Sequence, residues 1–371
     1  MKWFNDSKIS MVLFVFAATI VLGGSANADF TFGEPVNLRS VISVIDPAHD
    51  AIGCLSYDGL EMYIISGSGF AHDNDLKVIR RGSKDEGWGP MESLGPVVNS
   101  PNPSDDDSGP SISADGLTLY FHSTRPGGRG GEDIYVTTRA TKKDHWGPPS
   151  NLGSKVNSTS NDCGPWISAD GLELYFHSSR PVGYGKADIW VARRTTTTSA
   201  WTQALNVGSA VNSVDNEFWP GVSQDGLLFV FSSYNRTGGY GGEDIWMRRR
   251  PTISDPWQSP VNCGPKVNLS AYDDLPRISP DGCTLYFSTV SNWDDPSTWN
   301  NWQASIIVIV DFNDDGKVDL VDLVMLIEAW GTSETLCDIG PFAWGDGIVD
   351  IEDLKVFISY WEQENLPEDS Q

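Results

Sequence analysis

Basic residues are scarce in this sequence, which has 25 Lys and Arg against 50 Asp and Glu and a formal net charge of −25 over 371 residues. Nucleic acid is therefore excluded as a partner, because no basic stripe is left to release phosphate counterions. Long hydrophobic runs are absent after residue 28, so we expect no membrane span in the rest of the chain. With 39% hydrophobic residues and 15 Trp, the chain is nevertheless too apolar to be disordered.

Cysteine is also sparse, and its spacing contains neither a CxxC pair nor a Cys/His cluster. The sequence therefore predicts no structural zinc site. An odd number of cysteines leaves at least one thiol unpaired if every bridge is intramolecular, and the spacing does not determine the pairing. The five cysteines are Cys54, Cys163, Cys263, Cys283 and Cys337.

The first 28 residues have the pattern of a secretory signal peptide. Lys2 and Lys8 precede an apolar run at 9–22, and the small residues at 26–28 provide a cleavage site. A membrane anchor is the alternative, but the run is shorter than the roughly 20 residues that cross a bilayer. We therefore expect a secreted protein that is extracellular or lies at the cell surface.

Internal repeats dominate residues 29–310, and 37 Gly and 22 Pro punctuate the chain too often for long helices. An Asp-Gly pair recurs between a short strand and a run of Leu, Tyr and Phe, which is a strong hairpin signal with positive φ expected at both turn residues. Further strands, such as 133–136 and one after Trp146, give four short antiparallel strands per repeat. The sequence thus predicts an all-β, five-bladed β-propeller. The five turn aspartates are Asp58, Asp115, Asp170, Asp225 and Asp281.

The two ends of the repeat region complement each other. Residues 32–38 match the fourth-strand segment at 146–152, although no complete repeat precedes them. The last repeat starts near Asp273 and ends at 306–310 without such a segment. We therefore predict that an N-terminal strand completes the last blade and closes the ring, which leaves no free sheet edge.

The repeat pattern Ser-x-Asp-Gly-x-x-Leu-Tyr-Phe, followed by Ser-x-Arg-Pro and Gly-x-x-Asp-Ile-Tyr, resembles the TolB-type beta-propeller repeat family over about residues 29–310. The serine–arginine element is complete at 123–125 and at 178–180, whereas Arg236 is displaced by one residue and the first and fifth repeats lack the element. The resemblance implies a binding or scaffold role more often than chemistry, and it names no ligand.

An acidic residue stands eight positions before each turn aspartate. If each acid begins an innermost strand, all five converge at one mouth of the central channel. Two interpretations remain open: a ring of oxygen ligands for a cation or for sugar hydroxyls, or architectural acids that accept hydrogen bonds from the backbone or arginine of a neighbouring blade. These candidate ligand-binding residues are Asp50, Asp107, Asp162, Glu217 and Asp273.

No catalytic residue is assigned from the sequence, and Glu217 is the only candidate. A hydrolytic site needs two carboxylates in different environments, one protonated and one ionised, and five equivalent acids do not provide this difference. Glu217 is the one member that is not Asp, and its neighbours Phe218 and Trp219 make it the candidate for a raised pKa. His122 and His177 share one repeat position, and we expect partly buried histidines satisfied by a strand carbonyl.

The repeat stops at Asp311, where a calcium-loop pattern begins. Oxygen side chains occupy loop positions 1, 3, 5, 9 and 12, glycine occupies position 6, and Lys317 offers its carbonyl at position 7. An acidic surface loop is the alternative, but it does not explain the matched positions. A helix with apolar residues at Leu320, Leu323, Val324, Ile327 and Trp330 should follow and end at Gly331. The predicted Ca²⁺ ligands are Asp311, Asn313, Asp315, Lys317, Asp319 and Asp322.

A second, less regular loop follows, and its helix is expected over 351–361. Counting back from its end places Phe342 and Trp344 at positions 1 and 3, where neither side chain can ligate a cation. Asp338 takes position 1 if the loop carries four extra residues that bulge outward. The candidate Ca²⁺ ligands of this loop are Asp338, Asp346, Asp350 and Asp353.

Two half-repeats, each with Asp at position 12 and one helix after it, resemble the type I dockerin family over about residues 311–365, with a tail at 366–371. This resemblance implies docking onto a cohesin of a scaffold or cell-surface protein, in assemblies that degrade polysaccharides. It also implies partner contacts at loop positions 10 and 11, here 320–321 and 351–352. The two pairs differ, so binding in two equivalent orientations is not expected.

Together these features predict a secreted, non-catalytic propeller that binds a glycan or a protein surface and is tethered through a calcium-dependent dockerin-like module. The alternative is a glycoside hydrolase that uses the acids at the channel mouth, because dockerins usually carry such cargo. A third interpretation is a purely structural surface protein.

Overall fold

The computed structural model describes residues 30–365, except for gaps at 43, 47–49, 68–72, 251, 270–271, 293–297, 314–316 and 335. The predicted signal peptide, the C-terminal tail and the predicted calcium ligand Asp315 lie outside the described residues. Within the described part, most of the regular structure is short strands, and no helix is both long and apolar enough to cross a bilayer.

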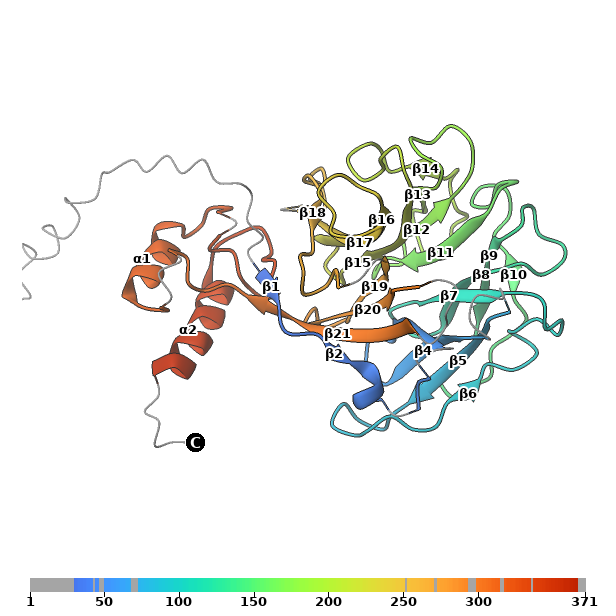
Figure 1. Ribbon diagram of the computed structural model, residues 1–371, viewed down its shortest axis with the longest axis horizontal. Helices are drawn as coiled ribbons and strands as arrows, with labels where there is room; N and C mark the ends of the chain where they lie inside the picture. Colours follow the sequence, from blue (N-terminus) through green and yellow to red (C-terminus); the bar gives the residue numbers. More distant parts are fainter. Residues whose placement is uncertain are drawn as a thin grey trace, which may run out of the picture.

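Three sheets have the four-stranded antiparallel arrangement that the repeat predicts. Each adds its strands in chain order, from an innermost strand to a two-residue outermost strand (Figure 1). The first sheet has β3 (Asp50–Leu55), β4 (Glu61–Ser66), β5 (Asp75–Arg80) and β6 (Glu92–Ser93). The second has β7 (Asp107–Ile112), β8 (Thr118–Ser123), β9 (Asp133–Thr138) and β10 (Ser150–Asn151). The third has β11 (Asp162–Ile167), β12 (Glu173–Ser178), β13 (Asp188–Arg193) and β14 (Leu205–Asn206).

The remaining strands form one nine-stranded sheet with two antiparallel halves. One parallel pair, Glu243 with Tyr272, joins β17 to β19. The first half has β15 (Glu217–Val222), β16 (Leu228–Tyr234), β17 (Glu243–Arg249) and β18 (Val261–Asn262). The second half has β19 (Tyr272–Ile278), β20 (Thr284–Val290), β21 (Trp299–Val308), β1 (Phe30–Phe32) and β2 (Val36–Asn37), and the short 3₁₀ helix η1 (Leu38–Ser40) follows β2.

The innermost strands contact one another around a common centre. β3 lies against β7, β7 against β11, β11 against β15, β15 against β19, and β19 again against β3. Small sheets arranged radially in this way form a β-propeller (Figure 1). We call the end of the centre where these five strands begin the channel mouth.

The N-terminal segment completes the sheet of the last repeat. β2 pairs with β21 at Val36–Gln303 and Asn37–Trp302, in the place where the other repeats have their two-residue fourth strand. β1 adds a pairing that the sequence does not predict, with Phe30 opposite Val308 near the end of β21. The first and last parts of the repeat region are therefore joined in one sheet.

The Asp-Gly turns differ from the expected geometry. Gly116 has a φ of +72°, and the other four turn glycines have similar values, but the preceding aspartates do not have positive φ. Asp115 instead accepts hydrogen bonds at Oδ1 from Leu117 N at 2.9 Å and from Ser113 Oγ at 2.6 Å. The expectation of positive φ at both residues is wrong, because the aspartate stabilises the turn through its side chain.

Repeated side chains connect the sheets to their linkers. Asn157 Oδ1 accepts a hydrogen bond from Ile134 N at 2.9 Å, and its Nδ2 donates to the carbonyl of the same residue at 2.9 Å. The guanidinium of Arg139 stacks over Trp146 at 4.4 Å, which explains the tryptophan before the fourth strand. Equivalent stacked pairs are Arg81–Trp88, Arg194–Trp201 and Arg250–Trp257.

The C-terminal residues build a core around two helices, α1 (Leu320–Glu328) and α2 (Ile351–Asn365). Leu326 and Phe357 are fully buried there, and they pack with the buried Val308, at the end of β21, and Val310, just after it. This part lies beside β1 and the end of β21 (Figure 1).

Candidate functional site

The five predicted ring acids stand at the channel mouth. Asp50, Asp107, Asp162 and Glu217 are the first residues of β3, β7, β11 and β15, and Asp273 is the second residue of β19. All five are buried, with at most 6% of their surface exposed. The structure therefore places them where the repeat predicts, but inside the protein.

Two of these acids are in ion pairs within their own sheets. Asp107 pairs with Arg125, and Asp162 pairs with Arg180. Asp162 also accepts a hydrogen bond from Ser158 N at 2.5 Å, and Arg180 donates to the carbonyl of Val156 at 2.6 Å. Such contacts favour an architectural role, because they occupy the carboxylate oxygens that a ligand would need. The arginines come from the same sheet, however, and not from a neighbouring blade as the interpretation expected. Ligand binding by the ring acids stays a prediction.

Glu217 is held in a similar way. It accepts hydrogen bonds from Ser213 N at 2.8 Å and from Ser233 Oγ at 3.0 Å, and its side chain is fully buried. Burial raises the pKa of Glu217, the direction expected from its neighbours. Nothing in the described residues provides a second carboxylate with a different environment beside it, so Glu217 does not form an acid pair.

A different carboxylate pair lies at the same mouth, between the two halves of the nine-stranded sheet. Glu243 begins β17, and Asp274 follows Asp273 on β19. The hydroxyl of Ser232 lies 2.9 Å from Glu243 Oε1 and 2.6 Å from Asp274 Oδ1, so one hydroxyl links the two carboxyl groups. Glu243 is 5% exposed, whereas Asp274 is half-buried.

The two carboxyl groups have different electrostatic surroundings. Burial raises the pKa of Glu243 well above its ordinary value, and the charge of Asp274 raises it further. Burial also raises the pKa of Asp274, but hydrogen bonds from Ser232, Leu275 N and Trp219 and the nearby charge of Arg277 favour its ionised form. We infer that the pair shares one proton, with Glu243 as the neutral partner and Asp274 as the anion.

Strained backbone surrounds this pair. Trp219 and Leu275 have φ of +49° and +54° at the repeat position where the second and third sheets have Gly109 and Gly164. Side chains with a β-carbon rarely adopt such values, and their strain is often found at functional sites. The Trp219 ring centroid lies 5.2 Å from that of His177, so the indole forms part of the wall of the mouth.

An arginine fills the centre below Trp219. The Arg277 guanidinium lies 5.5 Å from the ring of Trp219 and 5.4 Å from the ring of Trp166, and its Nε donates to the carbonyl of Gly53 at 2.6 Å. Its Nη2 is buried with no hydrogen-bond partner among the described residues. Arg277 thus places a positive group near Asp274.

The repeated histidines are buried, but the bonds that satisfy them are not the expected ones. Nδ1 of His122 accepts a hydrogen bond from Gly164 N at 3.2 Å, and Nδ1 of His177 accepts one from Trp219 N at 3.3 Å. The expectation of a strand carbonyl as partner is wrong for these bonds, because the imidazole nitrogen is the acceptor.

The opposite end of the centre holds a small cavity. Five of its lining residues occupy equivalent positions near the ends of the innermost strands, and none of these five is charged. The titratable side chains described above therefore lie at the other end of the centre, the channel mouth. The five residues are Leu55, Ile112, Ile167, Val222 and Ile278.

The two C-terminal loops end in the same hydrogen-bond pattern. Asp322 Oδ1 accepts from Phe312 N at 2.8 Å, and its Oδ2 accepts from Asp319 N at 2.9 Å. In the second loop Asp353 accepts at Oδ1 from Ile339 N at 2.6 Å and at Oδ2 from Asp350 N at 2.6 Å. The residues before Phe312 and Ile339 are Asp311 and Asp338, so the pattern makes these two aspartates equivalent, in agreement with a four-residue insertion in the second loop.

Their donor set fits a hard divalent cation. Asp338 accepts hydrogen bonds from Asp346 N and Gly347 N, both at 2.8 Å, and burial together with the nearby Asp353 raises the pKa of Asp338 to about 6. In the described part of the chain, Asp319, Asp322, Asp346, Asp350 and Asp353 have no Lys or Arg partner in an ion pair. Oxygen ligands gathered without a counter-charge suit Ca²⁺.

Comparisons with protein-family models and with curated proteins find no match to this sequence. Among solved structures, one described as a glycoside hydrolase has a TM-score of 0.50 at 9% identity, covering 82% of this chain and 96% of that one. An α-L-arabinofuranosidase from Lactobacillus brevis has a TM-score of 0.48 at 13% identity, covering 74% and 95%. TolB from Acinetobacter baumannii has a TM-score of 0.41 at 14% identity, covering 69% of this chain and 54% of that one, so the match spans about half its length. At these identities the likeness concerns the propeller fold.

Proposed function

We propose that this protein is a glycoside hydrolase whose acid pair is Glu243 and Asp274 at the channel mouth. The observation that carries the proposal is the contact of both carboxyl groups with the Ser232 hydroxyl in unequal surroundings, where the pKa of Glu243 is raised well above its ordinary value and several groups favour the ionised form of Asp274. Two carboxyl groups in different environments are one requirement for hydrolysis of a glycosidic bond. It replaces Glu217, the only catalytic candidate that the sequence suggests.

The proposed roles follow from the two environments. Glu243 donates its proton to the glycosidic oxygen as the bond to the anomeric carbon breaks, and Asp274 stabilises or attacks that carbon. Both carboxyl groups contact the same Ser232 hydroxyl, so they lie well inside the roughly 6.5–9.5 Å separation of inverting enzymes. The retaining route, with carboxyl groups about 5–5.5 Å apart, is the nearer of the two geometries, and it would require the pair to separate when the sugar enters. The half-buried Trp219 offers an aromatic face to the sugar.

Hydrolysis of a panel of chromogenic glycosides tests the proposal. Glu243→Gln and Asp274→Asn should each lower turnover by at least about 100-fold, because each removes one half of the proton transfer or charge stabilisation. Glu217→Gln is the matched control and should retain activity, since Glu217 is fully buried on β15. Turnover that survives both substitutions at the pair, or falls only with Glu217→Gln, would overturn the assignment.

Glycan binding without hydrolysis is the second candidate. The contact of both carboxyl groups with the Ser232 hydroxyl favours it, because the same oxygens suit the hydroxyl groups of a bound sugar. Glycan-array binding by a chain that cleaves no glycoside of the panel would support this candidate and reject the enzyme.

We also propose that the propeller has five blades. The nine-stranded sheet then consists of two blades, β15–β18 and β19–β21 with β2, since one parallel residue pair joins its halves. The ring of contacts among β3, β7, β11, β15 and β19 supports this division.

For residues 311–365 we propose a calcium-dependent, dockerin-like module that tethers the propeller to a cohesin-bearing scaffold or cell-surface protein. The equivalence of the two loop ends and the oxygen-rich donor set support it. Ca²⁺ would be held by Asp311, Asn313, Asp315, the Lys317 carbonyl, Asp319 and Asp322 in one loop, and by Asp338, Asp346, Asp350 and Asp353 in the other. Such a role goes with secretion and with a polysaccharide as the substrate.

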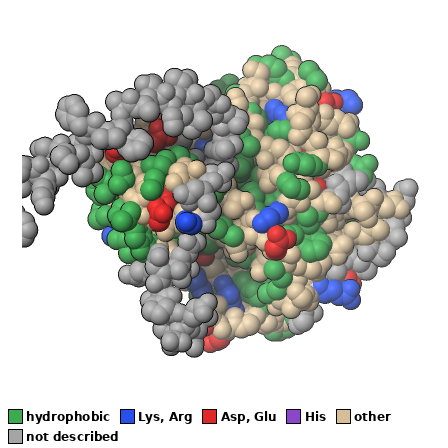
Figure 2. Space-filling view, turned by 60° about the vertical axis from the view of Figure 1, so that its left-hand side comes forward, with side chains coloured by type: hydrophobic (Ala, Val, Ile, Leu, Met, Phe, Trp, Pro, Cys, Tyr) green, Lys and Arg blue, Asp and Glu red, His purple; other side chains and the backbone are tan. Residues whose placement is uncertain are grey.

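The exposed face of α1 is the surface for that partner. Leu320 is 65% exposed and Val321 51%, and Val324 and Ile327 on the same helix are also exposed. Figure 2 shows hydrophobic side chains gathered on the side of the molecule where the C-terminal helices lie. Leu320 and Val321 are the positions at which the dockerin resemblance implies partner contacts.

A further inference from the structure

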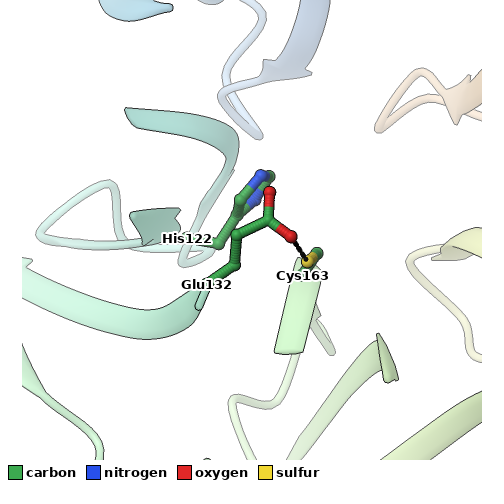
Figure 3. Close-up of side chains that lie close together, drawn as sticks. All are labelled: His122, Glu132 and Cys163. Atoms are coloured by element: carbon green, nitrogen blue, oxygen red, sulfur yellow. Dashed lines mark hydrogen bonds between the residues drawn. The ribbon is translucent and has the colours of Figure 1, made fainter. Parts of the chain in front are cut away.

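A second cluster at the channel mouth brings together a histidine, a glutamate and a cysteine from two neighbouring sheets. His122 lies on β8, Glu132 precedes β9, and Cys163 lies on β11. One ligand atom of each residue lies within 4.8 Å of the others, and Cys163 Sγ donates to Glu132 Oε2 at 2.9 Å. Figure 3 shows the Glu132 carboxylate between the imidazole and the sulfur.

The cluster is enclosed and rich in negative groups. His122 is 3% exposed and Cys163 5%, and Glu132 is half-buried. Asp106 Oδ2 lies 3.7 Å from His122 Nε2, and this aspartate is also buried. In the described part of the chain neither Glu132 nor Asp106 has a Lys or Arg partner in an ion pair. The site therefore offers a positive ion two carboxylates, which now accept hydrogen bonds from Asn74 and Cys163.

Comparison of the repeats shows that this cluster occurs at one interface between neighbouring sheets. The same three positions hold His177, Ala187 and Phe218 at the next interface, and Ser232, Glu243 and Asp274 at the one after it. Within the described residues, imidazole, carboxylate and thiol ligands gather only around His122. Because the repeat architecture is built equally well with other residues at these positions, the trio is not required for folding.

We propose that His122, Glu132 and Cys163 bind a divalent metal ion of the zinc type. Imidazole nitrogen, carboxylate oxygen and cysteine sulfur are the ligand types that Zn²⁺ accepts in tetrahedral sites. On binding, the metal displaces the thiol proton to solvent and bonds to the thiolate, so uptake releases one proton. For the metal to bind Nε2 of His122, the imidazole proton moves to Nδ1 and the hydrogen bond from Gly164 N is given up. Asp106, 3.7 Å from Nε2, would then complete the ligand set. The sequence misses this site because the three residues lie far apart in the chain.

Cobalt substitution tests the proposal without any assay of activity. The purified chain carries Cys283→Ser to remove the exposed thiol, and excess Ca²⁺ is present to compete at the acidic C-terminal loops. Addition of Co²⁺ under reducing conditions should give one equivalent of tight binding with a thiolate-to-cobalt charge-transfer band in the near ultraviolet. Zn²⁺ should displace it stoichiometrically.

Variants then assign the ligands. Cys163→Ser should abolish the charge-transfer band, and Glu132→Gln should weaken Co²⁺ binding by about tenfold or more. His177→Ala is the matched control and should leave both unchanged, because its neighbours are not metal ligands. Absence of the band in the parent chain, or its persistence in Cys163→Ser, would overturn the proposal. The Glu132→Gln measurement keeps the test decisive if the cysteine variant does not fold.

Discussion

At the residue scale, the shared proton of Glu243 and Asp274 makes stability depend on pH. The pKa of Glu243 is higher in the folded chain than in the unfolded one. Its contribution to the free energy of unfolding is therefore complete below its pKa in the unfolded chain, and it is lost as pH rises through its pKa in the folded chain. Glutamine cannot ionise. We therefore expect wild type to lose stability relative to Glu243→Gln as pH rises from about 4.5, where an unfolded Glu titrates.

Denaturant unfolding of both chains across the pH range measures this difference. Glu328→Gln, exposed on α1, is the control and should run parallel to wild type at every pH. If the difference in free energy of unfolding between wild type and Glu243→Gln did not change with pH, this result would contradict the shared proton.

Repetition in the sequence reveals architectural residues more readily than functional ones. The ring acids, the stacking tryptophans and the turn aspartates recur in each repeat or most of them, and their spacing is sufficient to predict their positions. Repetition does not reveal Glu243 and Asp274, because the equivalent residues in the third sheet are Ala187 and Cys163. Their pairing depends on the packing of two neighbouring sheets, which a single sequence does not display.

At the scale of elements, the pairing of β2 with β21 holds the first and last repeats together. Deletion of residues 29–45 should expose the edge of β21, lower the melting temperature and broaden the transition, because unpaired strand edges are unstable and promote aggregation. A scan by circular dichroism measures both effects, with deletion of the tail at 366–371 as the control. An undiminished cooperative melt of the longer deletion would refute the closure of the ring.

The calcium loops make a second prediction at this scale. Wild type should bind two Ca²⁺ ions, and Asp319→Ala should bind one, because the side chain is a proposed ligand and also caps α1 by accepting from Val321 N at 2.7 Å. Calcium at a hundredfold excess over its dissociation constant should stabilise the module by about 2.7 kcal/mol.

Titration calorimetry and circular dichroism with and without chelator measure the stoichiometry and the helicity. Asp85→Ala, an exposed acid in a propeller loop, should behave like wild type. Equal stoichiometry in Asp319→Ala and wild type would exclude the first loop as a site.

The periodicity of apolar residues predicts both C-terminal helices, and α1 ends shortly before Gly331, whose φ is +75°. It does not predict which apolar residues are covered: Leu326 is buried, whereas Leu320 and Ile327 are exposed. The apolar pattern also does not predict the turn geometry, which depends on side-chain hydrogen bonds. Nor does it predict β1, which depends on pairing with a segment far away in the chain.

At the scale of the whole molecule, the insertion in the second loop connects the C-terminal part to the propeller. Trp344 Nε1 donates to Asp225 Oδ2 at 2.6 Å, and the ring stacks on Phe342 at 5.2 Å. Asp225 belongs to one of the repeated turns, and the neighbouring turn glycine Gly282 leaves room for both rings. The residues that make the loop irregular are therefore those that dock it.

Removal of this contact should separate the two parts. Trp344 is 2% exposed, so Trp344→Ala should destabilise the docked arrangement by about 3–5 kcal/mol and give two calorimetric transitions instead of overlapping ones. Trp330→Ala is the control, since that ring is 44% exposed. A Trp344→Ala thermogram identical to that of wild type would show that docking does not depend on this side chain.

The acid pair at the channel mouth is the centre of this account, and a crystal structure of Glu243→Gln soaked with an oligosaccharide substrate tests it most directly. We predict a sugar ring against Trp219, with the glycosidic oxygen within hydrogen-bond distance of residue 243 and the anomeric carbon facing Asp274. A sugar bound only elsewhere, such as the opposite cavity or the surface of α1, would contradict the account.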